Sequence, residues 1–320
     1  MELNDKVFVA GHRGLVGSAV SRTLEQQGFT SLLTRRRDEL DLLDSNAVDA
    51  FFAREKPRHV FLCAAKVGGI LANRDYPAEF ISENLQIQNH VILSAHRHGV
   101  ERLLFLGSSC IYPREAPQPM KESHLLTGPL EFTNRAYAIA KIAGVEMCWA
   151  FNRQYGTRFL SVMPTNLYGP GDNYDLEKSH VLPAMIRKMH EAKRSGGPVT
   201  LWGSGTPRRE FLFSEEMAEA SVYLMRLSDA EFDTMLATDS EPPLINIGVG
   251  EDVSIRELAE LVAEVVGYSG SIEWDRSKPD GTPRKLLDVS KLTAAGWRSK
   301  VPLPEGVARA YRDFLSTYGE

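Results

Sequence analysis

The sequence predicts an α/β fold in which helices cover both faces of a parallel sheet. Short apolar runs alternate with amphipathic stretches throughout its first half. The runs expected to be strands are residues 6–10, 31–34, 59–65, 102–107 and 158–163. The stretches expected to be helices are residues 16–27, 47–55, 80–98 and 136–155. This alternation indicates a doubly wound parallel sheet, because parallel strands need crossover helices.

The pattern changes after residue 164, where proline and glycine cluster in PTNLYGPG, a composition typical of a loop. Helices are expected at 180–193, 214–227 and 255–266, and short strands at 199–201 and 244–248. Ser214 before two glutamates indicates an N-cap, and Ser254 with Glu257 has capping-box spacing. We expect a sheet domain over residues 1–166, rejoined by about 210–250, and a smaller C-terminal α/β domain from 167–209 and 251–320.

The composition is that of a globular protein, with 43% hydrophobic and 25% charged residues among 320. The net charge of −5, with both signs interspersed, gives no reason to expect nucleic-acid or membrane binding. The three cysteines, Cys63, Cys110 and Cys148, are too few and too widely spaced for a disulfide framework or a metal cluster. The N-terminus does not resemble a signal peptide, so we expect a cytoplasmic protein without a resident metal.

A glycine-rich turn, GHRGLVG at residues 11–17, follows the first predicted strand and precedes the first predicted helix. Its GxxGxxG spacing is a variant of the dinucleotide fingerprint, in which the glycines allow a tight turn and close approach of a pyrophosphate. The anion would lie on free N–H groups at the helix N-terminus. The context predicts a Rossmann-type domain, and a glycine turn without a ligand is the alternative.

The end of the second strand indicates which cofactor is bound. NAD enzymes place a carboxylate there for the ribose, whereas NADP enzymes need cations for the 2′-phosphate. This chain has three consecutive arginines at 35–37, and Arg13 in the glycine turn is a further candidate. Asp38 and Glu39 follow and would either neutralise the arginines or bind a ribose hydroxyl. The position of the arginines favours NADPH.

Tyr137 and Lys141 form a YxxxK motif on one face of a predicted helix. A nearby ammonium is expected to lower the tyrosine pKa from about 10. Such a tyrosine can protonate the alkoxide that forms when a ketone accepts hydride. Ser108 ends the fourth strand, where open α/β sheets bind ligands, and its hydroxyl would hold the substrate oxygen. The alternative is that Ser108 and Ser109 only cap a loop.

The glycine turn, Ser108 and YxxxK together resemble the extended short-chain dehydrogenase/reductase family, whose members mostly modify nucleotide sugars. The resemblance extends over residues 6–297 and narrows to the family's epimerase/reductases of GDP-linked keto-deoxy sugars. The segments that carry it are GHRGLVGSA, AAKVGGI, LGSSCIYP, YAIAKIAG, MPTNLYGP, WGSGTP and SKPDGTPRKLLD. It implies NADPH and, at one site, 3,5-epimerisation followed by 4-reduction of GDP-4-keto-6-deoxy-D-mannose.

The resemblance implies a catalytic set of Ser108, Cys110, Tyr137, Lys141 and His180. Cys110 would be the base and His180 the acid in epimerisation, while Ser108 and Tyr137 hold O4 and Tyr137 protonates it on reduction. Both C3 and C5 lie next to the C4 ketone, so one oxyanion-stabilising group serves both deprotonations. Without the resemblance, Cys110 could equally be a small loop hydrophobe and His180 an ordinary polar residue.

The resemblance also implies the binding residues. Those expected to contact the cofactor are Gly11, His12, Arg13, Gly14, Leu15, Val16, Gly17, Arg36, Arg37, Asp41, Leu42, Leu106, Gly107, Ser108, Lys141, Pro164, Thr165, Asn166, Leu167 and His180. Those expected to contact the substrate nucleotide are Lys188, Trp202, Arg209 and Asp280. An arginine suits a diphosphate because its fork pairs with two oxygens. For Trp202, a place in the core is the alternative.

Three positions depart from the family pattern. Phe213 and Glu215 stand where members commonly have histidine and aspartate. Lys188 stands where the family often has a substrate-contacting arginine. A lysine keeps the charge and loses bidentate geometry, so weaker binding of GDP is expected.

Two other functions fit parts of the same pattern. A colitose-type enzyme would act on a 3-deoxy sugar and invert only C5. A non-catalytic NADP sensor would need none of the catalytic residues, all of which this chain has. The resemblance further suggests a homodimer in which residues 80–98 and 136–155 of two copies form a four-helix bundle.

Overall fold

A computed structural model describes residues 1–176, 179–278 and 280–318. A six-stranded sheet forms its centre, with strand order β10-β5-β4-β3-β1-β2 and every neighbouring pair parallel. The strands are β1 (Val7–Ala10), β2 (Leu32–Leu33), β3 (His59–Leu62), β4 (Arg102–Leu106), β5 (Phe159–Pro164) and β10 (Leu244–Ile247). The predicted doubly wound, Rossmann-type sheet is thereby confirmed.

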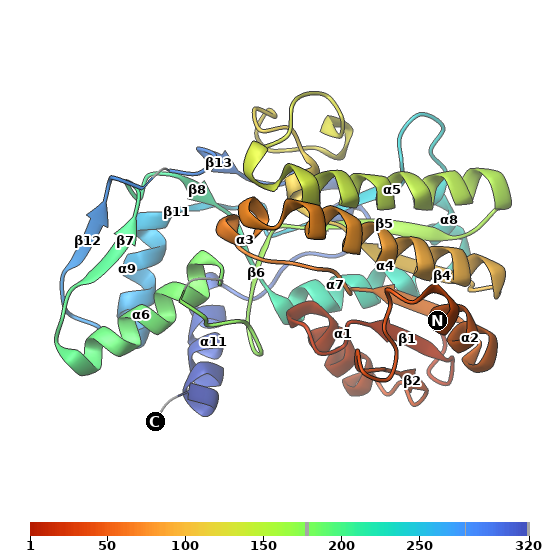
Figure 1. The fold of residues 1–320 in the computed structure, drawn as a ribbon, viewed down its shortest axis with the longest axis horizontal. Helices are drawn as coiled ribbons and strands as arrows, with labels where there is room; N and C mark the ends of the chain where they lie inside the picture. The colour runs from red at the N-terminus through yellow and green to blue at the C-terminus, as the bar shows by residue number, and fades with distance from the viewer. Residues whose placement is uncertain (177–178, 279, 319–320) are drawn as a thin grey trace.

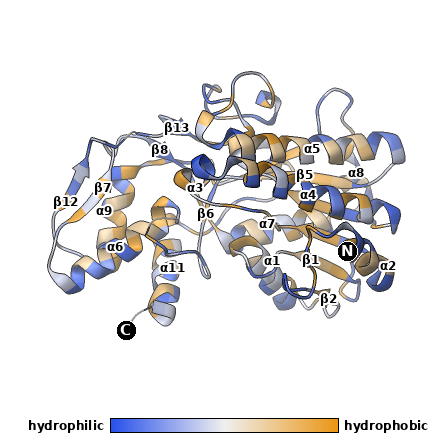
Figure 2. Ribbon diagram, in the orientation of Figure 1, coloured by the Kyte–Doolittle hydropathy of each residue, from blue (hydrophilic) through white to orange (hydrophobic). Residues whose placement is uncertain are grey.

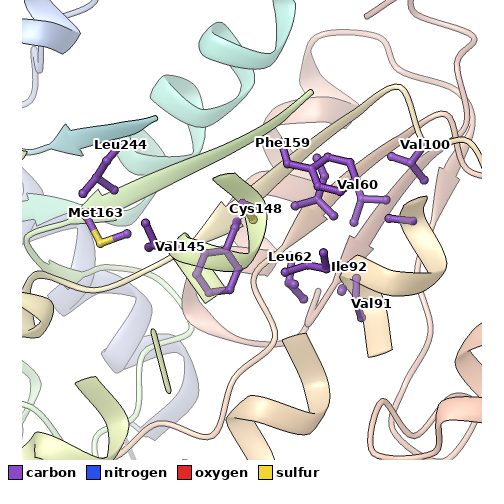
Figure 3. Packing of buried hydrophobic residues seen from close by; sticks show 14 of the residues in the cluster. Val60, Leu62, Val91, Ile92, Val100, Val145, Cys148, Phe159, Met163 and Leu244 are labelled. Atoms are coloured by element: carbon purple, nitrogen blue, oxygen red, sulfur yellow. The ribbon is translucent and has the colours of Figure 1, made fainter. Parts of the chain in front are cut away.

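Helices cover both faces of this sheet, because its strands are apolar on both sides (Figure 1). Neighbouring residues of β3 belong to different core clusters: Val60 and Leu62 to one, Phe61 to the other. The first cluster, shown in Figure 3, includes residues of α2 (Ser45–Glu55), α4 (Pro77–Arg97) and α5 (Arg135–Tyr155). The second includes residues of α1 (Leu15–Gln26) and α7 (Ser214–Arg226). Figure 2 shows the apolar helix faces turned inward and the polar faces turned outward.

A smaller C-terminal part has its own core, drawn on the left in Figure 1. Its helices α6 (Val181–Ser195), α9 (Ile255–Val266) and α11 (Leu303–Tyr318) pack with the parallel pair β7 (Val199–Trp202) and β12 (Ile272–Asp275). Two further small sheets connect it to the first part. In one, β8 (Arg208–Arg209) lies between β11 (Val253–Ser254) and β13 (Arg284–Lys285); in the other, β6 (Asn166–Tyr168) pairs with β9 (Phe211–Phe213).

Two local predictions are wrong. Residues 166–168, expected in a loop, form β6, because β9 supplies a partner from a distant part of the sequence. The N-cap of α7 is Phe213 and not Ser214, whose hydroxyl instead donates to Glu215 Oε2 over 2.9 Å. The capping box of α9 is confirmed, with Glu257 N donating to Ser254 Oγ over 3.1 Å.

The remaining elements are short and were not predicted. The helices are α3 (Ile70–Asp75), α8 (Asp229–Leu236) and α10 (Ser290–Ala294), and the 3₁₀ turns are η1 (Ser109–Ile111), η2 (Glu122–His124) and η3 (Phe132–Asn134). Elements of three to eight residues are too brief to show a clear period. Across the described ranges, every helix is too short or too polar to cross a bilayer.

Candidate active site

The glycine turn joins β1 to α1 with a geometry that only glycine satisfies. Gly11 has φ +86°, and a Cβ there would lie 2.7 Å from Ala64 N. A Cβ on Gly17 would lie 2.1 Å from the carbonyl oxygen of Gly11. Gly14 precedes α1 and offers no side-chain cap. The first N–H groups of α1 therefore remain available to an anion from outside the chain.

A cleft of about 1010 Å³ lies over the carboxyl ends of β1, β4 and β5. Most of the residues expected to contact a cofactor line it. These are Gly11, Arg13, Gly14, Leu15, Val16, Gly17, Arg37, Asp41, Leu42, Leu106, Gly107, Ser108, Pro164, Thr165, Asn166, Leu167 and His180. Three expected residues, His12, Arg36 and Lys141, are not part of its lining. The structure adds Asp172 and the segment 63–68, most of which lies in AAKVGGI but had not been assigned to binding.

The arginines near β2 differ in whether they are free to bind a phosphate. Arg35 pairs with Glu55 over 3.0 Å, and Arg36 with both Asp38 and Glu39 over 3.2 and 3.4 Å. Arg37 has a longer contact of 3.8 Å with Asp41. Among the described residues, Arg13 has no ion pair and lines the cleft. Arg13 and Arg37 are therefore the cations best placed for a phosphate in the cleft.

The hydroxyls of Ser108 and Tyr137 converge in the cleft. Ser108 follows β4 and Tyr137 lies in the first turn of α5; both side chains line the cleft, and Ser108 is near enough to Tyr137 to influence the pKa of its phenol. Ser108 Oγ also accepts from Cys110 N over 3.5 Å, which caps η1. Ser108 thus caps a turn and also faces the cleft, so the two interpretations of this residue are compatible.

Lys141 is buried one helical turn after Tyr137 and binds the main chain. Its Nζ donates to the carbonyl of Leu106 over 2.7 Å, and burial lowers its pKa to about 8. The expected lowering of the Tyr137 pKa is wrong: burial raises this pKa above its ordinary value, and the Ser108 hydrogen bond only partly opposes the rise. The physical reason is that the Lys141 Nζ lies 5.8 Å from the tyrosine ring centre and is directed at the Leu106 carbonyl.

Cys110 lies directly beside these hydroxyls. Its Sγ donates to Ser108 Oγ over 3.0 Å, and the side chain is buried. Burial raises the pKa of the thiol, and the charge of Lys285 is the largest influence that opposes the rise. Lys285, on β13, is therefore a site residue that the sequence reasoning missed. Its only signal was its place in the segment SKPDGTPRKLLD.

His180 is the N-cap residue of α6 and lies in the wall of the cleft that Ser108 and Tyr137 also line. Its side chain is exposed to the cleft, and the protein that surrounds it there partly desolvates the imidazole and lowers its pKa below the ordinary value. The neutral ring therefore dominates at pH 7, and its protonated form is a stronger acid than free imidazole.

The four residues expected to bind the nucleotide lie in the C-terminal part and do not line the cleft. Trp202 is 55% exposed, which excludes the core interpretation. Asp280 accepts from Ser204 N over 2.9 Å, two residues beyond Trp202. Arg209 is close enough to Asp280 for that carboxylate to oppose the lowering of its pKa by burial. Lys188 Nζ donates to the Thr200 carbonyl over 3.1 Å, at the start of the same strand segment.

Comparison with known proteins agrees with this geometry. Residues 7–247 match the NAD dependent epimerase/dehydratase family. The chain is 55% identical to GDP-L-fucose synthase of Escherichia coli, covering 97% of this chain and 96% of that protein. It is 35% identical to GDP-L-colitose synthase of Yersinia pseudotuberculosis, covering 97% and 98%.

Solved structures give the same result. A GDP-6-OMe-4-keto-L-xylo-heptose reductase from Campylobacter jejuni superposes with a TM-score of 0.94 at 38% identity, covering 99% of each chain. A GDP-L-fucose synthetase from Naegleria fowleri bound to NADP has a TM-score of 0.88 at 26% identity, covering 100% of this chain and 96% of that one. The chain belongs to the NAD dependent epimerase/dehydratase family.

Proposed function

We propose that this protein is an NADPH-dependent enzyme that converts GDP-4-keto-6-deoxy-D-mannose into GDP-L-fucose by 3,5-epimerisation and then 4-reduction. The observation that carries the proposal is the convergence of the Ser108 and Tyr137 hydroxyls in the cleft, with the Cys110 thiol 3.0 Å from Ser108 Oγ. This arrangement suits a ketone with acidic hydrogens on both neighbouring carbons. The names of the similar proteins give the same substrate class.

The cleft fits a dinucleotide phosphate. The open N-terminus of α1 would hold the pyrophosphate, and Arg13 and Arg37 the 2′-phosphate. When bound, NADPH supplies the hydride that reduces C4. The protein's own groups do the rest by holding the sugar and moving its protons.

In epimerisation, Cys110 removes the proton next to the ketone. A thiol whose pKa is raised is a strong base once ionised, and the charge of Lys285 favours the ionised form. Ser108 and Tyr137 donate to O4 as negative charge develops there. His180 returns a proton from the other face of the ring. In reduction, Tyr137 gives its own proton to O4.

The two parts of the chain divide the binding. We infer that residues 1–166 hold the cofactor, with the segment around β10 completing their sheet, and that 167–209 and 251–320 hold the GDP-sugar. The exposed Trp202, with the cation Arg209 and the carboxylate Asp280, suits a purine nucleoside diphosphate.

The direct test is to incubate the protein with GDP-4-keto-6-deoxy-D-mannose and NADPH and to identify the product sugar by NMR. Inversion at both C3 and C5 with a reduced C4 supports the proposal. Reaction only with a 3-deoxy keto-sugar, inverted at C5 alone, would favour the colitose-type enzyme. Absence of any turnover with either sugar would contradict both.

Replacing Arg13 by alanine should weaken the binding of NADPH and leave the binding of NADH unchanged. Arg13 is the cleft cation without an ion pair among the described residues, and a charge-assisted contact to a phosphate is worth about 1.5–3 kcal/mol. The KM for NADPH is therefore expected to rise about 10- to 100-fold. Arg35→Ala is the matched control, since Arg35 is already bound to Glu55. An equal rise for both cofactors would contradict the assignment.

The rate of reduction should fall as the pH rises through about 8. The buried Lys141 has its pKa lowered to about 8, so its charge is present well below this value and is lost as the pH rises through it, and the charge-assisted bond that ties α5 to the end of β4 beside Ser108 weakens with it. The pKa of Tyr137 is raised and lies beyond this limb, so the phenol keeps its proton. A pH profile of kcat/KM at saturating NADPH measures the limb. A profile that stays flat to pH 10 would show that the Lys141 charge is not needed.

We also infer a homodimer formed through the outer faces of α4 and α5. These helices pack side by side over the sheet (Figure 1), and α5 carries the exposed apolar residues Ile139 and Tyr155. A molar mass measured in solution by light scattering tests this inference.

A further inference from the structure

Glu210 is a fully buried carboxylate in the middle of the residues that the proposed function uses. It follows Arg209 directly and lies between β8 and β9. Its Oε1 accepts from Val249 N over 2.6 Å and from Gly250 N over 2.7 Å, and its Oε2 accepts from Leu287 N over 3.0 Å. Among the described residues no cation pairs with it, so three main-chain N–H groups satisfy its charge.

These contacts connect segments that are distant in sequence. Val249 and Gly250 follow β10, the edge strand of the large sheet. Leu287 follows β13, where Lys285 is the register partner of Arg209. The main-chain carbonyl of Glu210 accepts from Thr165 Oγ1 and Asn166 Nδ2, over 3.2 and 2.8 Å, at the cofactor cleft. The Glu210 carboxylate therefore binds the segments after β10 and β13. The Glu210 main-chain carbonyl binds Thr165 and Asn166, which line the cofactor cleft.

We propose that Glu210 is a positioning residue that sets Arg209 and Lys285 relative to the large sheet, and hence relative to Cys110. The pair of strands that carries them has only two residues in each strand, which is too little to fix a register alone. The Glu210–Leu287 bond extends that pair by one further contact, and the bonds to Val249 and Gly250 attach it to β10. This inference rests on the proposed function, because that function assigns Arg209 to the GDP-sugar and Lys285 to the Cys110 thiol.

Glu216 offers a matched control within the same chain. It is also a buried carboxylate, and it accepts from Ser299 Oγ over 2.7 Å, from Val301 N over 2.9 Å and from Lys300 N. Neither Glu216 nor residues 299–301 line the cleft. Replacement by glutamine removes the charge and one acceptor oxygen at either position. Both variants should be less stable than the wild type, and only Glu210→Gln should change the KM and kcat/KM for the keto-sugar nucleotide.

The experiment compares Glu210→Gln and Glu216→Gln with the wild-type protein, well below their melting temperatures. For Glu210→Gln, the KM for the keto-sugar nucleotide should rise about tenfold and kcat/KM should fall about 100-fold, because displacement of about 1 Å has effects of that size. The Kd for NADPH, measured by fluorescence titration, should stay within about twofold, since the hydrogen bonds of Thr165 and Asn166 to the Glu210 main-chain carbonyl remain in this variant. For Glu216→Gln, all three constants should match the wild type.

A binding measurement separates this inference from the proposed function. Calorimetric titration with GDP alone requires no turnover, and Glu210→Gln should bind GDP about tenfold more weakly than Glu216→Gln. If the wild type binds GDP but does not convert the keto-sugar, the proposed function fails and the comparison of GDP affinities still tests Glu210. Equal GDP affinity in both variants, or an equal change of KM in both, would overturn the positioning role.

A second variant covers the case in which Glu210→Gln does not fold. A Cβ on Gly248 would lie 2.3 Å from Glu210 Oε1, so Gly248→Ala displaces this oxygen from its bonds to Val249 N and Gly250 N without removing the charge. The same pattern is expected, with weaker GDP binding and unchanged NADPH binding. Unchanged GDP binding in Gly248→Ala would count against the proposal.

Discussion

Replacing Tyr137 by phenylalanine is expected to lower the rate of NADPH oxidation with the keto-sugar by about 10²- to 10⁴-fold. The change removes one oxygen from the cleft, and with it the proton that O4 receives when C4 is reduced. Positioned proton transfer contributes about this factor in enzymes generally. The loss should appear in kcat, since the phenol acts on charge that develops only as the reaction proceeds. Absorbance of NADPH at saturating substrate measures it.

Tyr174→Phe is the matched control for this prediction. Tyr174 is a buried tyrosine outside the cleft lining, and its hydroxyl donates to the Ala310 carbonyl over 3.1 Å. The Tyr174→Phe protein should be somewhat less stable than the wild type and should oxidise NADPH at the wild-type rate. A Tyr137→Phe protein whose rate stays within about tenfold of the wild type would show that another group protonates O4.

Replacing Cys110 by serine is expected to reduce solvent deuterium incorporation at C3 and C5 by about 10²- to 10⁴-fold. A hydroxyl is a far weaker acid than a thiol, so the base of the epimerisation is lost. Sγ lies 3.0 Å from Ser108 Oγ, so it stands next to the group that holds the ketone oxygen. NMR of the sugar after incubation in D₂O, with NADP+ in place of NADPH to prevent reduction, measures the exchange.

Cys148→Ser provides the comparison, because Cys148 is a fully buried cysteine in the core between α5 and the sheet (Figure 3). The Cys148→Ser protein should incorporate deuterium at C3 and C5 at the wild-type rate. Exchange at that rate in Cys110→Ser would mean that a different residue removes the protons, and Lys285 would be the next group to test.

Most of the large sheet could be predicted because its strands are buried on both faces. Runs such as residues 59–62 are apolar or packed on both sides, so they stand out in the sequence without any partner being known. The small sheets could not be predicted. β8, β11 and β13 have two residues each, and what makes them strands is a partner from elsewhere in the chain.

Among the catalytic residues too, those with local signals could be predicted and those that depend on distant contacts could not. Ser108 and Tyr137 follow from local signals, a strand end and a helical spacing, and the structure brings them together. The spacing of Tyr137 and Lys141 gives a shared helix face but not the direction of the ammonium, which binds the Leu106 carbonyl, so the predicted pKa of Tyr137 had the wrong sign. Lys285 was missed because its role depends on the effect of its charge on Cys110, 175 positions away in the chain.

The place of β10 in the sheet has a consequence for how the chain can be divided. This strand is encoded after much of the C-terminal part, yet it lies at the sheet edge beside β5. A fragment that stopped near residue 166 would leave the β10-facing edge of the apolar strand β5 unpaired, because β4 pairs only with its other edge. Bare edges of that kind recruit other strands and aggregate. We therefore expect that a fragment ending near residue 166 does not fold as an independent soluble unit.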